Sequence, residues 1–442
     1  MPVSKNRSKS HKKSKINQRK PHFYAAANLL QQCLSEENVN NIGHESGLFQ
    51  RVRKIRPLAF LLSFVQAFSG GKQTSHLSDI LRTYIYQNGE SLAYKAWHTH
   101  LDKNEFSEFM LQILNELVTA LSFKWLKGAA HNLLNKFDDI LIQDGSSFSV
   151  HKKLESIFPG RFKKNGPAAV ELHLTYSIFE QCIFKLQLSA DTDSERKYLP
   201  EPATLKDKLL LADRGYYKYS YFKEVIEAGG NFIMRLTKNL SPKVVGMDMK
   251  LKEYVSQLGR KDFDVLVETG EKGKSSFVFR IVGLWNPKKN EYWYLATNLD
   301  ANDYNTDLLS RLYHFRWQVE LVFKQWKSHC NLKKFNTRKE NIAMGLIWAS
   351  LISHVLVSFV GNVIRCHNPV DELTLLNISK ASLKFMMDLP QILAQGDVVQ
   401  LAKWLENVEV FLLRTAKRKN IKRDQTHGAL NLGLEKLPGR LK

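Results

Sequence analysis

The sequence YHFRWQVELVFKQWK occupies residues 313–327, and it separates into two faces when placed on a helix with 100° between neighbouring residues. One face holds a single carboxylate among groups that can bind phosphate: Tyr313, Arg316, Glu320, Lys324 and Lys327. The roughly opposite face is apolar and consists of Phe315, Val319, Val322 and Trp326. This pattern favours a metal ligand held beside a DNA backbone, on a helix whose other side packs in a core.

The composition indicates a folded, basic protein of two or three domains. The chain has 442 residues, of which 43% are hydrophobic and 11% aromatic. Lys and Arg outnumber Asp and Glu by 22. An excess of this size favours a polyanionic partner, nucleic acid first and an anionic membrane second. A basic protein without such a partner is the alternative.

The cysteines and the first residues indicate the cellular compartment. The four cysteines are scattered without a Cys-x-x-Cys pair: Cys33, Cys182, Cys330 and Cys366. This spacing argues against a disulfide framework or a zinc ribbon and fits a reducing cytoplasm. Residues 1–20 lack the apolar run of a secretory signal peptide. We therefore expect a cytoplasmic, nucleoid-associated bacterial protein.

One segment is long and apolar enough to cross a bilayer. Residues 343–364 carry no formal charge, although the segment includes Ser353, His354 and Asn362. Basic residues flank it on both sides. We interpret it as a buried core helix and expect no contact with a membrane.

The N-terminal part of the chain reads as a basic arm followed by helices. Residues 1–21 contain eight Lys and Arg and no acid, so they are expected to form a disordered arm that neutralises phosphates or only aids solubility. Residues 22–130 have helical periodicity and are expected to form a DNA-binding domain. The turn signal Asn88-Gly89 joins two of its helical stretches.

These two stretches have the order of a helix-turn-helix. The second would present to the major groove Ser91, Tyr94, Lys95, His98 and Thr99. A helical hairpin that serves only packing is the alternative, and the sequence does not choose between them.

The remainder of the chain predicts an α/β core with an insertion. Residues 131–240 alternate apolar strands with one helix and are expected to form the first part of a mixed sheet. Residues 241–302 look like a separate β-rich insertion, residues 303–370 like the second part of the core, and residues 371–442 like a helical region with a basic tail.

Three carboxylates in this core are candidates for a shared site. Asp144 and Asp213 each directly follow an apolar strand, where an α/β sheet presents its ligands, and Glu320 lies on a later helix. Brought together they would repel unless cations lay among them. Oxygen-only ligands favour two Mg²⁺ or Mn²⁺ ions, the arrangement used for phosphodiester chemistry.

Taken singly, each acid has an ordinary alternative. An Asp before Gly-Ser-Ser commonly forms a turn, and a Glu between Arg and Lys commonly forms solvated ion pairs. Asp138 and Asp139 compete for the first role, but they open the predicted strand whereas Asp144 closes it.

The spacing of Tyr313, Arg316, Glu320 and Lys327 resembles the Tyr-Arg-Glu-Lys signature of the insertion-sequence-four (IS-four) family of DDE transposases. The order Asp144, Asp213, Glu320 is similar to the catalytic triad of that family. The long, strand-bearing gap before Glu320 resembles its ribonuclease-H-like fold interrupted by a β insertion. The resemblance covers residues 130–365 most closely.

The resemblance implies a role for each matched residue. The three acids would be catalytic and bind two Mg²⁺ or Mn²⁺ ions. The DNA end would be contacted by Tyr313, Arg316, Lys324 and Lys327. Trp293 would stack a flipped base. Arg214 and Arg235, beside the catalytic strands, are further candidates for phosphate contacts.

The implied reaction is cut-and-paste transposition at terminal inverted repeats, with transfer of the 3′ ends into target DNA and, in several members, hairpin ends. A homodimeric synaptic complex is implied as well, with residues 399–413 as a candidate interface. Three alternatives remain from the residues alone: a ribonuclease-H-like nuclease or resolvase, a DNA-binding regulator that has lost catalysis, and a helical scaffold.

Overall fold

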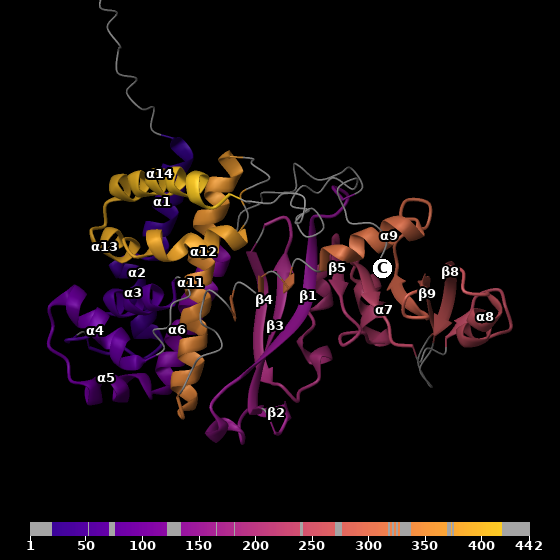
Figure 1. Ribbon diagram of the computed structural model, residues 1–442, viewed down its shortest axis with the longest axis horizontal. Helices are drawn as coiled ribbons and strands as arrows, with labels where there is room; N and C mark the ends of the chain where they lie inside the picture. The colour runs from indigo at the N-terminus through magenta and orange to yellow at the C-terminus, as the bar shows by residue number, and fades with distance from the viewer. Residues whose placement is uncertain are drawn as a thin grey trace, which may run out of the picture.

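The computed structural model describes residues 20–417, apart from residues 52, 70–75, 122–133, 165, 181, 239–241, 270–275, 317–318, 321, 324–325, 328–336, 369–372 and 374. Within this part the chain folds into a ten-stranded mixed sheet with helices gathered mainly beside one end of it (Figure 1). The predicted α/β class is confirmed. The predicted arm at residues 1–19 and the tail from residue 418 lie outside the described residues.

The expected strands of the core are present. They are β1 (Asp139–Ser149), β3 (Gly166–Ser177), β4 (Cys182–Ala190), β5 (Lys208–Ala212) and β6 (Asn231–Arg235). A short β2 (Pro159–Phe162) was not expected. The sheet runs β2-β3-β1-β5-β6-β10-β9-β8-β7, and β4 pairs with β3. Helix α7 (Tyr219–Glu227) connects β5 to the parallel strand β6, as the pattern predicted.

The expectation that Asp144 closes its strand is wrong, because β1 continues to Ser149. The strand has two neighbours of different length. The parallel partner β5 ends opposite Gln143, whereas the antiparallel partner β3 pairs with β1 as far as Ser149. The long β3 thus keeps Gly-Ser-Ser in a strand, and the alternative of a turn at Asp144 does not apply. Asp144 is the first residue beyond the parallel pairing.

The predicted insertion contains β7 (Lys243–Val244), α8 (Leu251–Gln257), β8 (Phe263–Thr269), β9 (Phe277–Asn286) and β10 (Glu291–Thr297). Its strands do not form a separate sheet. β10 pairs antiparallel with β6, so that Leu295 lies opposite Arg235. The insertion therefore extends the core sheet and places β10 beside β6.

The N-terminal region is helical, as expected. It comprises α1 (Pro21–Cys33), α2 (Glu36–Glu45), α3 (Pro57–Phe68), α4 (Leu77–Asn88), α5 (Tyr94–Leu101) and α6 (Asn104–Ala120), of which α2 was not expected. Gly89 ends α4 with φ of +68°, a conformation that glycine adopts without strain. The turn predicted at Asn88-Gly89 is confirmed.

Helix α11 (Glu340–His367) stands between these helices and the sheet (Figure 1). By length and composition it is the one helix of the described residues that is able to cross a membrane, but 83% of its apolar window is buried inside the protein. It packs against α6, α3 and β4. A Cβ atom at Gly345 would overlap the ring of Phe106 on α6, so the two helices approach closely. This burial is what the core-helix interpretation requires.

The C-terminal helices are α12 (Leu375–Met386), α13 (Leu389–Ala394) and α14 (Val398–Thr415). The side chain of Asp397 caps α14 by accepting from the backbone N–H groups of Val399 and Gln400. The apolar side of α14 packs on α1 within the same chain, while Val399 and Val410 remain exposed (Figure 1). Residues 399–413 were the candidate dimer interface, and most of their apolar surface is thus covered by other parts of the same chain.

Candidate active site

Strand register brings two of the candidate acids together. Gln143 of β1 pairs in parallel with Ala212 of β5. Asp144 directly follows Gln143, and Asp213 directly follows Ala212. Each carboxylate accepts a hydrogen bond from the following backbone N–H, Asp144 from Gly145 at 2.9 Å and Asp213 from Arg214 at 2.8 Å. The end of the parallel pairing thereby fixes two carboxylates side by side.

The segment that carries the third acid is not one continuous helix. Helix α9 (Thr306–Tyr313) ends at Tyr313, a 3-10 turn covers His314–Arg316, and helical conformation resumes at Val319 and Glu320. The expectation that residues 313–327 form a single helix is therefore wrong at its start. The tight turn lets Phe315 and Arg316 both point inward, and they are 2% and 8% exposed.

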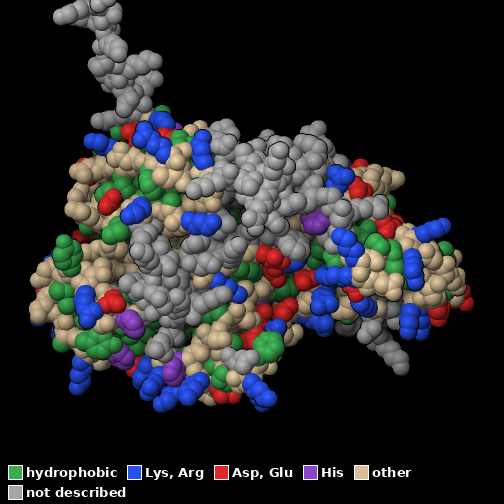
Figure 2. All heavy atoms as spheres, in the orientation of Figure 1, with side chains coloured by type: hydrophobic (Ala, Val, Ile, Leu, Met, Phe, Trp, Pro, Cys, Tyr) green, Lys and Arg blue, Asp and Glu red, His purple; other side chains and the backbone are tan. Residues whose placement is uncertain are grey.

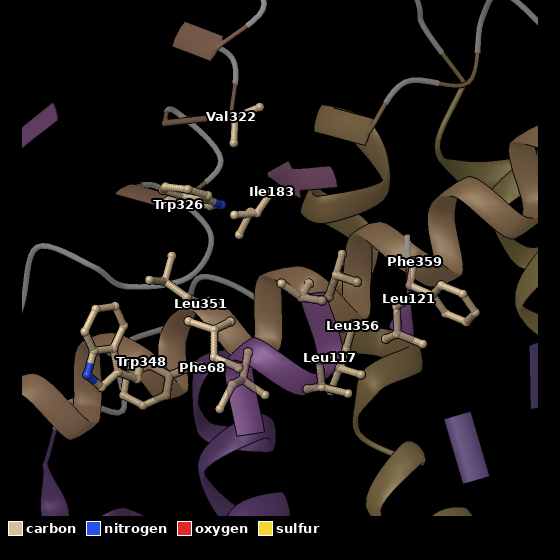
Figure 3. Packing of buried hydrophobic residues seen from close by; sticks show 14 of the residues in the cluster. Phe68, Leu117, Leu121, Ile183, Val322, Trp326, Trp348, Leu351, Leu356 and Phe359 are labelled. Atoms are coloured by element: carbon tan, nitrogen blue, oxygen red, sulfur yellow. The ribbon is translucent and has the colours of Figure 1, made fainter. Parts of the chain in front are cut away.

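The apolar stripe of this segment is buried as predicted. Phe315, Val319, Val322 and Trp326 are all at most 5% exposed. Figure 3 shows Val322 and Trp326 directed toward Ile183 of β4 and toward α11. The Trp326 ring meets the His354 ring of α11 edge-on, with 5.2 Å between centroids. This packing anchors the segment that carries Glu320 against the core.

Arg316 joins two of the three acids. Its Nη1 atom donates to Oδ2 of Asp144 at 2.7 Å, and its Nη2 atom donates to Oε1 of Glu320 at 3.4 Å. Burial raises the pKa of Asp144 to about 6, opposed by Arg316 and reinforced by the negative charges of Asp213 and Glu320. The three carboxylates therefore sense one another's charge around a single guanidinium.

A second chain of contacts leads from Asp213 to the insertion. Tyr313 donates its hydroxyl to Asp213 at 3.3 Å, and Arg235 lies 3.9 Å from the same carboxylate. The guanidinium of Arg235 also lies over the ring of Trp293, 4.7 Å from its centroid. The β6–β10 pairing thus connects the partly buried Trp293 to the Asp213 carboxylate through Arg235.

A family model described as the transposase DDE domain matches residues 135–356. The chain belongs to this family. It is 24% identical over 371 residues to a transposase for insertion sequence element IS1151 of Clostridium perfringens, an alignment that covers 73% of this chain and 77% of the relative.

Two further relatives carry similar names. A probable transposase for insertion sequence element IS5377 of Geobacillus stearothermophilus is 22% identical over 343 residues, which are 75% of this chain and 84% of the relative. A transposase for IS231F of Bacillus thuringiensis subsp. israelensis is 24% identical over 275 residues, which are 52% and 58% of the two chains. The family and these relatives support a DNA transposase function, and the family implies dependence on a divalent metal.

The acids of this DDE transposase fit divalent cations by their chemistry. All three candidate ligands are carboxylates, the donors that hard cations prefer. Their side chains remain partly accessible, at 18% for Asp144, 31% for Asp213 and 47% for Glu320. No His, Cys, Asp or Glu triplet within the described residues is already gathered as a metal cluster. The group that binds the acids here is the Arg316 guanidinium.

The other candidate residues of the transposase differ in accessibility. Tyr313 and Arg316 are buried and face the acids, so neither presents a surface to DNA in this conformation. Lys327 donates its Nζ to the carbonyl of Ser147 at 3.0 Å, and Arg214 is exposed. Lys324 lies outside the described residues.

Asp139 and the residues around Arg161 differ in how far the sequence predicted them. Asp139, which competed with Asp144, accepts hydrogen bonds from the backbone N–H groups of Ile140 and Phe179, so it serves the sheet. The sequence did not predict the polar network around Arg161. Its only sequence signal is the acid-rich stretch after β4.

One face of the molecule has a mixed charge. Figure 2 shows acidic side chains gathered near the middle of one face, over the region of β1 and β3, with Lys and Arg side chains around them. Basic groups around an acidic centre suit the approach of a DNA backbone.

Proposed function

We propose that this protein is the transposase of an insertion sequence of the Tyr-Arg-Glu-Lys type, with a ribonuclease-H-like core. It would cleave DNA at the terminal inverted repeats of its element and join the 3′ ends to target DNA. One observation carries the proposal. Asp144 of β1 and Glu320 of the segment after α9 share the Arg316 guanidinium, and Asp213 follows the neighbouring strand β5, close enough for its charge to act on Asp144.

The three acids would hold two Mg²⁺ or Mn²⁺ ions. Such ions, when bound, activate the attacking oxygen and stabilise the leaving oxygen of a phosphodiester. The backbone hydrogen bonds at Gly145 and Arg214 orient Asp144 and Asp213, and the buried apolar stripe orients Glu320. These three carboxylates would thus be held in place before a metal ion binds.

Arg316 and Tyr313 would change partners on the DNA end. In the free chain the guanidinium of Arg316 neutralises the acids, and a phosphate could take over that interaction as bidentate contacts. The exposed Arg214 and the Lys327 ammonium would follow the backbone nearby, and Lys324 would join them. These contacts position the scissile phosphate.

Trp293 would stack on a base displaced from the end of the element. Arg235 and Lys289 lie over its ring, at 4.7 and 5.6 Å from the centroid, so cationic groups already surround the aromatic face. A flipped nucleotide brings both a π face and a phosphate, which these groups match. This arrangement favours hairpin-forming chemistry.

Recognition of the repeat would involve the α4–α5 pair. A cavity of about 350 Å³ lies between this pair and the start of α11, and its lining includes His76, Tyr94, His98, Arg338 and Lys339 but no acid. Exposed on or just before α5 are Ser91, Lys95 and Thr99. A basic groove beside a helix that faces solvent fits a DNA backbone beside a major groove.

The working assembly would be a homodimer on two element ends, in the cytoplasm and associated with the nucleoid. Because the apolar side of α14 is covered by α1, its exposed Val399 and Val410 are the part of that helix still open to a partner.

Cleavage of a labelled element end tests the function. The inverted repeats that border the coding region supply the duplex, and wild type is compared with Asp144→Asn in Mg²⁺. We expect nicking and joining to a target plasmid by wild type, and a loss of at least about 100-fold in the variant with end binding retained. Cleavage without joining would favour a nuclease, and equal cleavage by both proteins would remove Asp144 from the mechanism.

A further inference from the structure

Two glycines beside the catalytic acids are backed by carboxylates. A Cβ atom on Gly145, which follows Asp144, would lie 2.6 Å from Oε1 of Glu171. A Cβ atom on Gly215, two residues after Asp213, would overlap Oε2 of Glu195. The missing side chain at each glycine therefore leaves room for a carboxylate against the backbone, Glu171 beside Asp144 and Glu195 beside Asp213.

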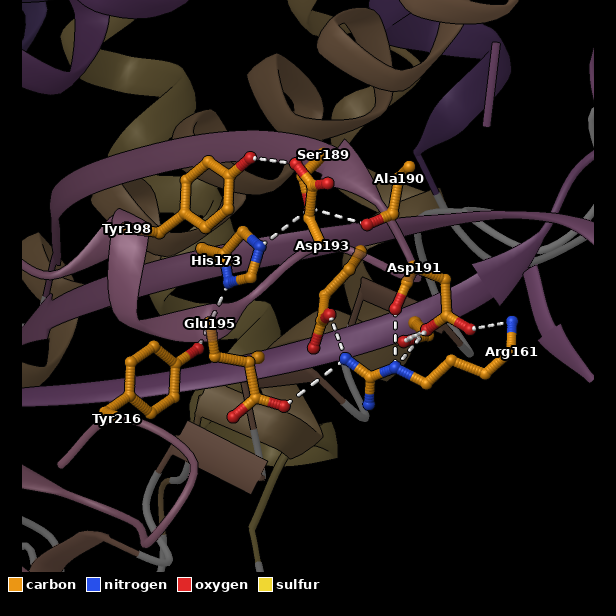
Figure 4. A network of polar contacts seen from close by, with 12 residues as sticks. Arg161, His173, Ser189, Ala190, Asp191, Asp193, Glu195, Tyr198 and Tyr216 are labelled. Atoms are coloured by element: carbon orange, nitrogen blue, oxygen red, sulfur yellow. Dashed lines mark hydrogen bonds and ion pairs between the residues drawn. The ribbon is translucent and has the colours of Figure 1, made fainter. Parts of the chain in front are cut away.

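One arginine binds both of these acids. Nη2 of Arg161, on the edge strand β2, lies 2.6 Å from Oε2 of Glu171 and 3.4 Å from Oε1 of Glu195 (Figure 4). The same side chain donates its Nε–H to the backbone carbonyl of Asp191, and the backbone N–H of Arg161 donates to Oδ2 of Asp191 at 2.8 Å. Arg161 thus gathers three acids from the end of β4 and the adjoining strand and turn.

The third acid, Asp191, is connected to Lys327 through Ser147. Asp191 accepts a hydrogen bond from the hydroxyl of Ser147, whose backbone carbonyl accepts from Nζ of Lys327. Each acid around Arg161 therefore contacts one part of the active site: the chain after Asp144, the turn after Asp213, or the residue that binds Lys327.

This network lies behind the catalytic strand. Successive side chains of a strand point to opposite faces, so Gly145 and Ser147 face the network while Asp144 faces the other way. Glu171 and Asp191 are only 4% and 5% exposed at their side chains. The network therefore lies on the opposite face of β1 from the Asp144 carboxylate, and its direct contacts with the site are made at the backbone around Gly145 and Gly215.

We propose that Arg161 is a positioning residue: through Glu171 and Glu195 it holds the chain at Gly145 and Gly215 in register, and so sets the separation of Asp144 and Asp213. The inference rests on the proposed function, because it assumes that these two acids share divalent cations. Residues that orient metal ligands commonly change metal affinity by 10- to 100-fold when they are removed.

The test measures Mn²⁺ binding to the full-length protein without DNA, by the loss of the free Mn²⁺ electron paramagnetic resonance signal. Arg161→Met removes the charge and keeps much of the length, and Arg161→Lys restores a charge without the planar fork. Glu195→Ala removes the support of Gly215 together with one partner of Arg161, and it disturbs little of the core, since this side chain is 25% exposed. It provides a folded test should Arg161→Met fail to fold.

A matched control separates positioning from stability. Arg280 is 4% exposed and paired with Asp264 on the insertion strands, and it donates to the carbonyls of Leu299 and Tyr304. Arg280→Met should lower the melting temperature at least as much as the Arg161 change and leave Mn²⁺ affinity unaltered. Asp144→Asn tests the metal site itself.

We expect about tenfold weaker Mn²⁺ binding in Arg161→Met, a smaller loss in Glu195→Ala and partial recovery in Arg161→Lys. Wild-type affinity in folded Arg161→Met and Glu195→Ala, with affinity lost in Asp144→Asn, would overturn the positioning role alone. Wild-type affinity in Asp144→Asn as well would instead overturn the metal site on which the inference rests.

Discussion

Arg316 donates to Asp144 across 2.7 Å, although the two residues stand 172 positions apart in the chain. The same guanidinium reaches Glu320 at 3.4 Å. A buried cation between two carboxylates offsets their repulsion in the absence of metal. Arg316 therefore offsets part of the negative charge of Asp144 and Glu320 in the free protein.

Arg316→Met should change metal binding and cleavage in opposite directions. Without the competing guanidinium, Mn²⁺ should bind the free chain more tightly, by about tenfold or more. Tenfold corresponds to about 1.4 kcal/mol, which is only part of the several kcal/mol that a charge pair at this distance is worth at an effective dielectric constant of about 20. Cleavage of the element end should fall, because the phosphate contact is lost. Mn²⁺ titration and a gel assay of labelled ends measure the two effects. Weaker Mn²⁺ binding in the variant would mean that Arg316 organises the acids and does not compete with the metal.

Trp293→Ala should separate the first nick from later steps. Stacking of one base on an aromatic ring is worth about 1–3 kcal/mol, so the step that needs the displaced base should slow by about tenfold or more. The first nick should be nearly unchanged, and Trp293→Phe should retain most of the activity. Denaturing gels of end-labelled duplex resolve the products. An equal slowing of both steps would place Trp293 in the fold of the insertion, where its indole N–H already donates to Glu291.

Arg338→Ala should reduce the salt dependence of DNA-end binding. A lost phosphate contact lowers the slope of log affinity against log salt concentration by about 1. Arg338 is exposed in the groove beside α5, whereas its neighbour Lys339 is paired with Asp102. Lys243→Ala, which removes an exposed lysine of the insertion paired with Asp248, is the control. Equal slopes for wild type and Arg338→Ala would exclude a phosphate contact at this groove.

His354 should make the fold sensitive to mild acid. Burial lowers its pKa from 6.5 to about 3, so the unfolded chain binds this proton at a higher pH than the folded chain does. Its contribution to stability is therefore complete above pH 6.5 and is lost as the pH falls toward 3. At pH 5 the loss is about 2 kcal/mol. In urea titrations, His354→Gln should show a drop from pH 7.5 to pH 5 that is smaller by this amount. An identical drop in both proteins would contradict the assignment.

Much of the core could be predicted because its signals are local. The apolar runs that became β3, β5 and β6 and the stripe from Phe315 to Trp326 are periodic in the sequence and buried in the structure. The Asn88-Gly89 turn was readable because glycine tolerates a positive φ. Short elements such as β2 and α2 were missed, since few residues carry each of their patterns.

Other features depended on partners distant in the sequence. Asp144 follows a good strand and precedes turn-forming residues, yet pairing with β3 carries the strand on to Ser149. Pairing with β3 overrode the local preference of these residues for a turn, and no local sequence pattern identifies β3 as the partner. For the same reason the insertion looked separate, although β10 joins β6 through backbone hydrogen bonds that carry no sequence signal.

The sequence by itself determined the residue types of the site: two acids after apolar strands, a third in the Tyr313–Lys327 motif, and basic and aromatic groups at fixed spacing around it. Only the tertiary structure decided what these groups do to one another. It turned Arg316 and Tyr313 inward to the acids, connected Trp293 to Asp213 through Arg235, and placed Arg161 beside the two acids that back Gly145 and Gly215. The chemical type of each side chain is given by the sequence. The distances between these side chains and their burial depend on the register of strands and on the packing of segments far apart in the chain.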